Sequence, residues 1–203
     1  ATVTTPFVFD RRADLGSYRI GFTEDAPESF LEKLSDLGAN LQEMNELPEF
    51  RSDQLGADSA AAFDYHVAPG GVEPEPIPQD LEEDEARRRG RFRRGRDARA
   101  MDYINGQRRR LIFMKRMQEA MDGFDMFVSG SGEVGLTNDT GHPATIVQYD
   151  FGVRNPDSES PTTMPLTTTI VGDLYADDKI LNVAHAFQSA TEWHLRRPTL
   201  PDM

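Results

Sequence analysis

Apolar and polar positions in the first fifty residues predict a β-α-β unit. Residues 18–22 form a short apolar run typical of a strand, and apolar side chains then recur at helical spacing over about residues 27–37. Gly38 marks the end of this helix. Residues 41–47 alternate like a second strand, which Pro48 ends. Two strands joined by a crossover helix lie parallel in a sheet.

The pattern after residue 97 predicts a long helix followed by a strand. The helix covers about residues 98–121, and one stripe along it is apolar and typical of core packing: Met101, Ile104, Leu111, Met114 and Met117. The strand covers residues 124–128 and leads into a glycine-rich loop.

The last sixty residues predict a hairpin and a closing helix. Two β-rich runs, 144–151 and 166–171, are separated by a loop and are expected to pair as antiparallel strands. The helix begins with Asp177 or Asp178 as its N-cap and ends near Leu195. Its inward side is predicted to carry Ile180, Leu181, Ala184, Phe187, Thr191 and Leu195. Together the elements predict an α/β fold, with a mixed β-sheet flanked by helices.

Residues 70–97 interrupt this pattern with an acidic block followed by an arginine block. Eight acids and eight arginines lie between Glu73 and Arg99, so the segment is close to neutral. Phe92 is its one aromatic residue for stacking on bases. This composition favours a solvated, flexible insertion whose charges pair with one another, and the alternative is an arm that binds RNA, phosphate or a protein partner.

Composition limits the classes of function that remain. The chain has 203 residues, enough for one domain, and 35 acids against 22 bases give it a net charge of −13. This charge argues against general nucleic-acid binding. The absence of cysteine excludes disulfides, thiolate metal sites and cysteine nucleophiles. No apolar run approaches the length of a membrane span and no signal peptide opens the sequence, so we expect no membrane association and leave export open.

A glycine pattern raises the question of a nucleotide site. Gly130, Gly132 and Gly135 form G-x-G-x-x-G after an apolar strand, and Asp150 lies 18 residues beyond Gly132. A dinucleotide site needs a helix that begins at these glycines and crosses to a parallel strand. The eight residues after Gly135 contain a glycine and a proline, which predict that no such helix forms.

Other catalytic patterns are also missing. The four histidines include no pair four residues apart and no H-E-x-x-H, and G-x-S-x-G does not occur. A triad of Ser129 or Ser131 with His142 and an aspartate rests on composition alone. We therefore expect no catalytic set, metal or cofactor within this chain.

The run LTNDTGHPATIV over residues 136–147 resembles a motif in the C-terminal half of amidase signature enzymes. In that family a strand ends in a small-residue loop, which is followed by Asn-x-Thr-Gly-x-Pro-Ala and a further strand. Four other segments resemble parts of the family in the same order: 6–21, 101–110, 124–129 and 166–188. The resemblance covers most of the chain outside residues 70–97, so residues 1–203 are expected to form a single partial amidase domain.

The resemblance also implies what this chain lacks. Amidase signature enzymes use a Ser–cis-Ser–Lys triad in a Gly/Ser-rich core that lies upstream of the matched part. This sequence has no Gly-Gly-Ser-Ser-Gly run, and Lys33 is its only lysine before the long helix, so no catalytic residue is carried over. The family sheet is then cut, which leaves an apolar edge that needs covering. A start at Ala1 agrees with a fragment, a cleaved product or one chain of a split enzyme.

The matched part implies one wall of a substrate pocket. Small and hydroxyl-bearing residues are expected to leave room for an amide substrate and to orient it: Ser129, Gly130, Ser131, Thr137, Asn138, Thr140, Gly141 and His142. The alternative is that Gly141 only shapes a turn and Asn138 only bonds to backbone. The sequence departs from the family at His142, where an apolar residue is common, and at residues 148–150, where the family has an apolar-Pro-Gly end.

The resemblance favours the C-terminal portion of a hydrolase that cleaves C–N amide bonds through an acyl-serine intermediate. Its partners are then a small amide substrate and the N-terminal amidase segment that carries the triad. One alternative is a non-catalytic interaction module that uses the Glu/Arg-rich segment, and another is a fragment of an amidotransferase subunit that acts on charged tRNA. The acidic composition gives the last little support, and the sequence leaves homodimer formation open.

Overall fold

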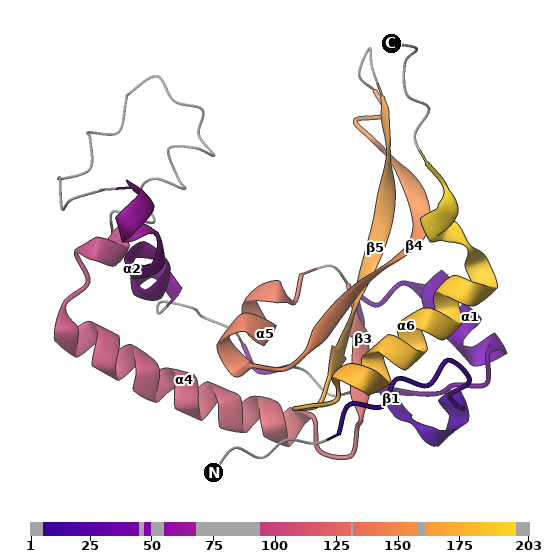
Figure 1. The fold of residues 1–203 in the computed structure, drawn as a ribbon, viewed down its shortest axis with the longest axis horizontal. Helices are drawn as coiled ribbons and strands as arrows, with labels where there is room; N and C mark the ends of the chain where they lie inside the picture. The colour runs from indigo at the N-terminus through magenta and orange to yellow at the C-terminus, as the bar shows by residue number, and fades with distance from the viewer. Residues whose placement is uncertain are drawn as a thin grey trace. The chain divides into compact units, whose positions relative to one another are not determined.

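The computed structural model describes residues 6–44, 47–49, 55–67, 94–130, 132–157 and 161–197. Figure 1 shows the chain as a ribbon. It divides into two compact units, the first made of Ala1–Pro48 with Met117–Met203 and the second of Glu49–Arg116. The charged segment predicted over 70–97 lies outside the described residues up to residue 93, as does the predicted site residue Ser131.

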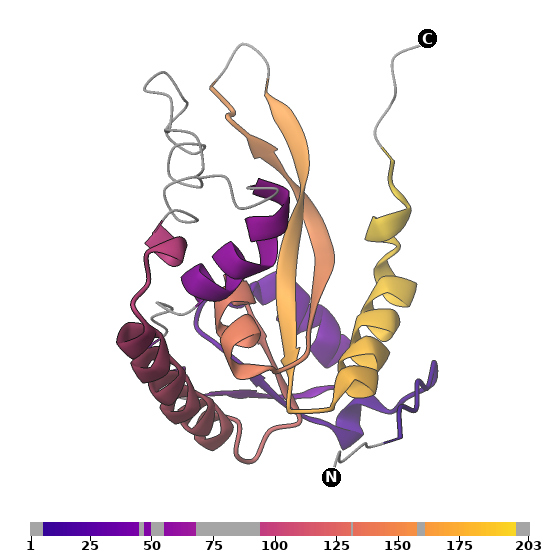
Figure 2. The ribbon, with the colours of Figure 1, turned by 60° about the vertical axis from the view of Figure 1, so that its left-hand side comes forward.

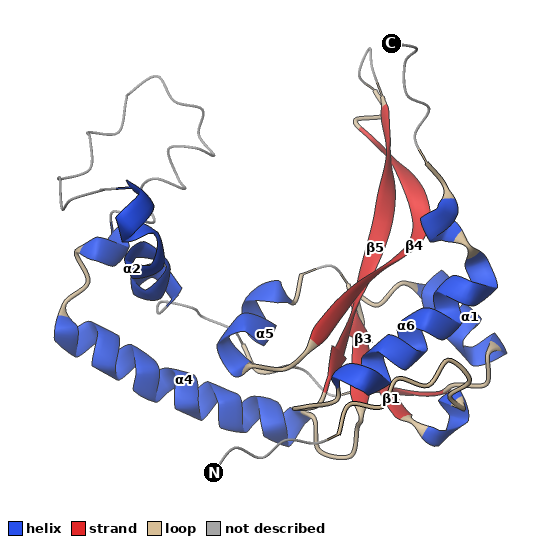
Figure 3. Ribbon diagram, viewed as in Figure 1, coloured by secondary structure: helices blue, strands red, loops and turns tan. Residues whose placement is uncertain are grey.

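A five-stranded mixed sheet forms the centre of the first unit. Its strands are β1 (Arg19–Phe22), β2 (Asn40–Glu43), β3 (Met126–Ser129), β4 (Ala144–Arg154) and β5 (Thr162–Gly172). They lie in the order β2-β1-β3-β5-β4, coloured red in Figure 3. Strand β1 is parallel to β2 and β3, whereas β5 is antiparallel to β3 and β4. The predicted fold class, the parallel β-α-β unit and the antiparallel hairpin are therefore confirmed.

Helices of the first unit cover the two faces of this sheet. They are the 3-10 turn η1 (Leu15–Ser17), α1 (Glu28–Asp36), α5 (Val134–Thr140), α6 (Asp177–Thr191) and the 3-10 turn η3 (Trp193–Leu195). Helices α1 and α6 lie on one side of the sheet and α5 on the other in both Figures 1 and 2. The second unit holds α2 (Leu55–Val67) and most of α4 (Ala100–Ala120), whose last turn belongs to the first unit.

The main core lies between the sheet and the pair α1 and α6. The rings of Phe30 from α1 and Phe187 from α6 are in contact with centroids 4.3 Å apart and planes inclined by 40°, and both side chains are buried. Alternate strand residues reach this core: Ile20, Met126, Val128, Val147 and Ile170. A period of two in the strands and of three to four in the helices places these apolar side chains on facing surfaces.

The opposite face of the sheet is buried where β3 and β5 pair. Phe127 lies opposite Val171 and Ser129 opposite Thr169, and all four side chains are buried. These residues alternate along the strands with those of the main core, so they point to the other side. This second face carries two hydroxyls, and it is the face on which α5 lies (Figure 2).

The predicted loops and helix ends need several corrections. A helix, α5, does begin within the glycine-rich loop, although the sequence pattern predicted none. Strands β4 and β5 extend through most of the predicted loop over 152–165 and leave only residues 155–161 between them. The second strand ends at Glu43 rather than near Leu47, and α6 ends at Thr191.

The predicted apolar stripe on the long helix is largely exposed. Met101 is 67% exposed and Leu111 54% exposed, whereas Met117 is buried. Gly106 is buried too and lies on the same side of α4 as Met117, since eleven residues make almost three full turns. The prediction was therefore wrong for the first three turns, because the buried face of α4 is not the predicted stripe.

Helix α6 likewise buries a different set of side chains from the one predicted. Ile180, Ala184 and Phe187 are buried as expected, but Leu181 is 38% exposed and Leu195 is 56% exposed. Asn182 is buried instead: its Oδ1 accepts from the Asp10 backbone N–H, and its Nδ2 donates to the Tyr18 hydroxyl. The predicted cap is also wrong, since Ala176 occupies the N-cap position and both aspartates lie in the first turn.

Candidate functional site

The predicted pocket wall begins where β3 ends. Ser129 is fully buried, and its carbonyl accepts a 2.6 Å hydrogen bond from Thr168 Oγ1. Its hydroxyl donates to the Gly130 carbonyl at 3.3 Å. Thr169 faces Ser129 from β5 on the same side of the sheet, and its buried Oγ1 has no hydrogen-bond partner among the described residues. Two hydroxyls therefore lie side by side on a buried surface of the sheet.

Gly130 follows at the carboxyl end of β3 and lies against Asp25. A Cβ added at Gly130 would overlap Asp25 Oδ2 and would lie 3.1 Å from Asp25 Cγ. Asp25 itself follows β1, and its Oδ1 accepts a 2.5 Å hydrogen bond from Thr23 Oγ1. A side chain at this position would have to displace the Asp25 carboxylate, because the backbone of one strand end approaches the carboxylate that follows the next strand.

A second carboxylate, Glu133, lies close to this point. Burial raises the pKa of Glu133, and the negative charge of Asp25 raises it further. The two acids therefore approach each other at the carboxyl ends of the parallel strands β1 and β3. Sequence reasoning missed both, although acids within four residues of the ends of two predicted strands are a signal that could have found them.

The remaining predicted residues belong to α5 and the turn after it. Thr137 Oγ1 donates to the Glu133 carbonyl at 3.2 Å, one turn earlier in the helix. Asn138 is exposed. Gly141 ends the helix with a φ of 82°, and its N–H donates to the Thr137 carbonyl. This is the left-handed position at which glycine commonly ends a helix.

His142 is held in one tautomer by Thr140. Thr140 Oγ1 donates its single hydrogen to the Leu136 carbonyl at 2.9 Å, so it accepts from His142 Nδ1, also at 2.9 Å. His142 Nε2 then carries a lone pair, is buried and has no partner among the described residues. Burial lowers the pKa of His142, and the charge of Asp173 opposes this effect. The ring is therefore a neutral, buried hydrogen-bond acceptor.

These residues form two groups at opposite ends of β3. Pro143 accepts a backbone hydrogen bond from Gly172, which pairs with Met126 at the start of β3. His142 therefore lies at the level where β3 begins, whereas Ser129 ends it three residues later, about 10 Å along the strand. Ser129 and Gly130 make one group, and Thr140, Gly141 and His142 make the other. They are not brought into a single cluster.

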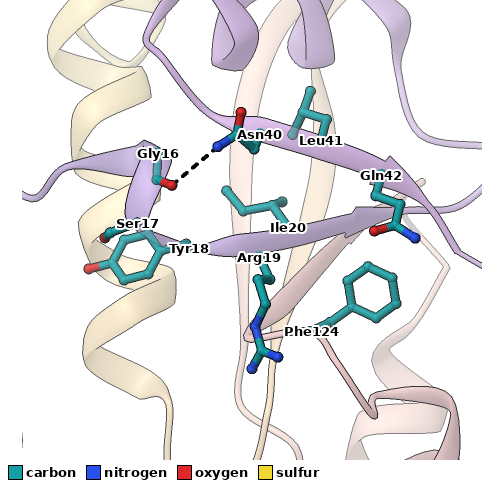
Figure 4. Close-up of a pocket in the computed structure, with 9 residues that line it drawn as sticks. All are labelled: Gly16, Ser17, Tyr18, Arg19, Ile20, Asn40, Leu41, Gln42 and Phe124. Carbon is teal, nitrogen blue, oxygen red and sulfur yellow. Dashed lines mark hydrogen bonds between the residues drawn. The ribbon is translucent and has the colours of Figure 1, made fainter.

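A separate pocket of about 240 Å³ lies at the other end of the sheet. Figure 4 shows that β1, β2 and Phe124 line it, with Ser17, Arg19, Asn40 and Gln42 among the polar residues. Asn40 Nδ2 donates to the Gly16 carbonyl at its rim, at 3.2 Å. None of the predicted site residues lines this pocket.

Metal-binding clusters and membrane-spanning helices are both missing from the described part of the chain. Within it, no group of three or more His, Cys, Asp or Glu side chains is arranged to hold a metal ion. No helix in the described ranges is both long and apolar enough to cross a membrane.

Sequence comparison finds relatives of this chain among the A subunits of glutamyl-tRNA(Gln) amidotransferase. No family model matches it. It is 39% identical to the A subunit of glutamyl-tRNA(Gln) amidotransferase from Janthinobacterium sp. (strain Marseille) over 62 residues, which are 30% of this chain and 12% of that protein. It is 26% identical to the same protein from Aromatoleum aromaticum over 114 residues, 48% of this chain and 23% of that protein. The matches thus span less than a quarter of these relatives.

Structure comparison extends the likeness to almost the whole chain. The structure of 6-aminohexanoate cyclic dimer hydrolase matches 98% of this chain and 50% of its own length, with a TM-score of 0.65 and 17% identity. A bacterial aryl acylamidase of the amidase signature family matches 91% of this chain and 46% of its own length, with a TM-score of 0.62 and 16% identity. The chain thus spans about half the length of these enzymes, and at such identities the likeness concerns the fold. These likenesses identify the chain as a C-terminal portion of the amidase signature fold.

Proposed function

We propose that this chain completes the fold of an amidase signature hydrolase and supplies one wall of its substrate pocket. The completed enzyme cleaves a C–N amide bond through an acyl-serine intermediate, and the polypeptide that carries the Ser–Ser–Lys triad is a separate segment. Residues 1–203 then form one partial amidase domain, with residues 70–97 as a charged insertion.

One observation carries this proposal. The chain matches 6-aminohexanoate cyclic dimer hydrolase over 98% of its own residues but over only half of that enzyme. The unmatched half must therefore supply whatever this chain lacks if the two proteins share a reaction type. The sequence supports this interpretation, because its three lysines are Lys33, Lys115 and Lys179 and none follows the pattern of the family's triad.

Three residues at the end of β3 and on β5 support a contribution to a pocket. Ser129 and Thr169 present hydroxyls from neighbouring strands. The Thr169 hydroxyl makes no hydrogen bond to any described residue, so it could bond to a substrate. Gly130 lies beside them, and the Asp25 carboxylate occupies the space that a side chain at Gly130 would take. Hydroxyls that are fixed by strands can orient an amide group with little loss of conformational entropy.

The test is whether amide hydrolysis requires the polypeptide that carries the Ser–Ser–Lys triad. We expect the purified 203-residue chain to show no hydrolysis of a chromogenic anilide, and the same chain to hydrolyse it when the polypeptide encoded directly before Ala1 is supplied. A Thr169→Val variant keeps the shape of the wall and removes its hydroxyl, so it should lower kcat/KM of the completed enzyme. Turnover by the chain alone would overturn the proposal.

A second candidate is a portion of an amidotransferase. The observation that favours it is the sequence match to the A subunit of glutamyl-tRNA(Gln) amidotransferase, at 39% identity over 62 residues. The completed protein would then transfer an amide to glutamyl-tRNA(Gln) together with further polypeptides. Assaying the completed protein in parallel with glutamyl-tRNA(Gln) and with the anilide separates the two candidates.

A further inference from the structure

The two edge strands of the sheet in the first unit differ in length and in charge. Strand β2 is one edge and β4 is the other, since the order is β2-β1-β3-β5-β4. Strand β2 has four residues and ends in Glu43, whereas β4 has eleven residues and pairs only with β5 among the described strands. Short, charged edges resist further pairing, and long edges invite it.

The hydrogen-bond pattern tells which groups of β4 reach the open edge. The Gly172 N–H donates to the Pro143 carbonyl at 2.9 Å, so the pair Ala144–Val171 is of the non-hydrogen-bonded kind. In an antiparallel ladder the two kinds alternate. Thr145 and Val147 therefore bond to β5, and the N–H and C=O groups of Ala144, Ile146 and Gln148 point away from it.

The first five residues of β4 lack the features that usually protect an edge. Residues 144–148 read ATIVQ, without charge or proline, and Ile146 is 57% exposed. The regular register ends at an irregularity between Gln148 and Asp150. Edges are commonly blocked by lysine, proline or an early bulge, and here the bulge comes only after this stretch.

This edge is continuous with the predicted pocket wall. Ser129 pairs with Thr169, and Thr169 pairs with Ile146, so the three residues make one row across β3, β5 and β4. All three side chains share one face of the sheet. A strand added beyond β4 would place its own residue in this row, about 10 Å from Thr169, because strands lie about 4.8 Å apart.

We propose that the open edge of β4 at residues 144–148 receives a β-strand of the triad-bearing polypeptide. This inference rests on the function proposed above and adds the place and mode of docking. The half-length match to solved amidases supports a polypeptide partner of similar size. The net charge of −13 disfavours a second copy of the same chain, since two such chains repel.

Hydrogen exchange tests the mode of pairing directly. In the chain alone, the amides of Ile146 and Gln148 should exchange fast, and those of Thr145 and Val147 slowly. When the polypeptide encoded directly before Ala1 is bound, all four amides should become protected. Unchanged fast exchange at Ile146 and Gln148 in the bound state would overturn the inference.

A matched pair of variants tests the surface. Ile146→Lys places a charge on the proposed edge, and Val153→Lys makes the same change on the same strand at a residue with the same exposure of 57%. Both should keep the circular dichroism spectrum and thermal midpoint of the parent chain. We expect Ile146→Lys to weaken binding of that polypeptide roughly tenfold or more and Val153→Lys to change it less than about twofold.

A backbone variant tests the same edge without adding charge. Ile146→Pro removes an N–H that points away from β5 and breaks no hydrogen bond of the hairpin, so it should leave the hairpin folded and still weaken binding. Equal binding by the parent and both Ile146 variants would overturn the docking site and leave the proposed function standing. Failure of the parent chain to bind would overturn the proposed function. A dimer of the chain alone that Ile146→Lys dissociates would overturn the choice of partner.

Discussion

His142 Nδ1 donates to Thr140 Oγ1 at 2.9 Å, and this one bond fixes the histidine as a buried acceptor. The turn that carries it links α5 to β4, so the residue lies at a junction of the fold. Its sequence motif suggested a pocket residue, and the structure places it at the level where β3 begins.

The first prediction concerns stability at mildly acid pH. The pKa of His142 in the folded chain is lowered from 6.5, so below that pH the unfolded chain binds a proton that the folded chain does not. Unfolding free energy should therefore fall as pH drops from about 6.5 towards the folded pKa. Urea unfolding at pH 7.5, 6.0 and 5.0 measures it, and His142→Gln should flatten this part of the profile. An unchanged profile in the variant would contradict the assignment.

The second prediction concerns the junction of β1, β3 and α6 at Asp125. Its Oδ1 accepts from Lys179 Nζ at 2.6 Å, and its Oδ2 accepts from the Arg19 N–H at 2.9 Å. Burial alone would raise the pKa of Asp125, but these bonds and the charges of Lys179 and Arg19 together lower it. Asp125→Ala should cost about 1–3 kcal/mol of unfolding free energy at pH 7.

The acid dependence of this junction follows from the same shift. A carboxylate with a lowered folded pKa stabilises the fold above its unfolded pKa, near 3.8, and the stabilisation is lost as pH falls below it. The penalty of Asp125→Ala should therefore shrink between pH 5 and pH 3. Lys179→Met is the control, because it removes the 2.6 Å contact and keeps the bond from the Arg19 backbone.

The third prediction concerns the tight approach at Gly130. Gly130→Ala should destabilise the chain by about 1–3 kcal/mol, because the new methyl group overlaps the Asp25 carboxylate. Gly132→Ala is the matched control, since nothing lies within 4 Å of a Cβ at that position. Adding Asp25→Ala to Gly130→Ala should restore part of the loss in a double-mutant cycle. Equal effects at both glycines would contradict the close contact.

The fourth prediction concerns the acid pair. The pKa of Glu133 is raised in the folded chain, so the folded chain binds a proton more readily than the unfolded chain does. Stability from this group is therefore complete at low pH and is lost as pH rises through the folded pKa. Glu133→Gln should stabilise the chain at pH 7 and have little effect near pH 4. In an Asp25→Asn background this difference should shrink only in part, because burial is the larger cause of the raised pKa of Glu133.

The sequence pattern predicted the sheet well because strand periodicity and helix spacing are local signals. It failed at α5 because Gly141 and Pro143 were interpreted as preventing a helix. In the structure Gly141, at φ 82°, only ends one that had already formed. It also failed on α4, where apolar residues occur on more than one face and spacing alone does not tell which face is buried.

The site was less predictable than the fold. The motif singled out Ser129 and Thr140, whose side chains are buried in the structure, since small polar residues beside a strand end are visible in sequence. The contact of Asp25 with Gly130 arises only because β1 and β3 pair, although the two residues lie far apart in the chain. Thr169 was missed for the same reason: its importance comes from the register that places it opposite Ser129.

The place of β5 in the sheet has a consequence for how the chain is made. Strands β3 and β4 run in the same direction, yet β5, the last of the five to leave the ribosome, lies between them. Until residues 162–172 are synthesised, β4 has no partner among the described strands and β3 pairs only with β1. Until then the described part of the sheet consists of β2, β1 and β3, with β4 unpaired. The five-stranded sheet can form only when β5 inserts between β3 and β4. Such long-range, late contacts slow folding and leave apolar strands uncovered until β5 has been made.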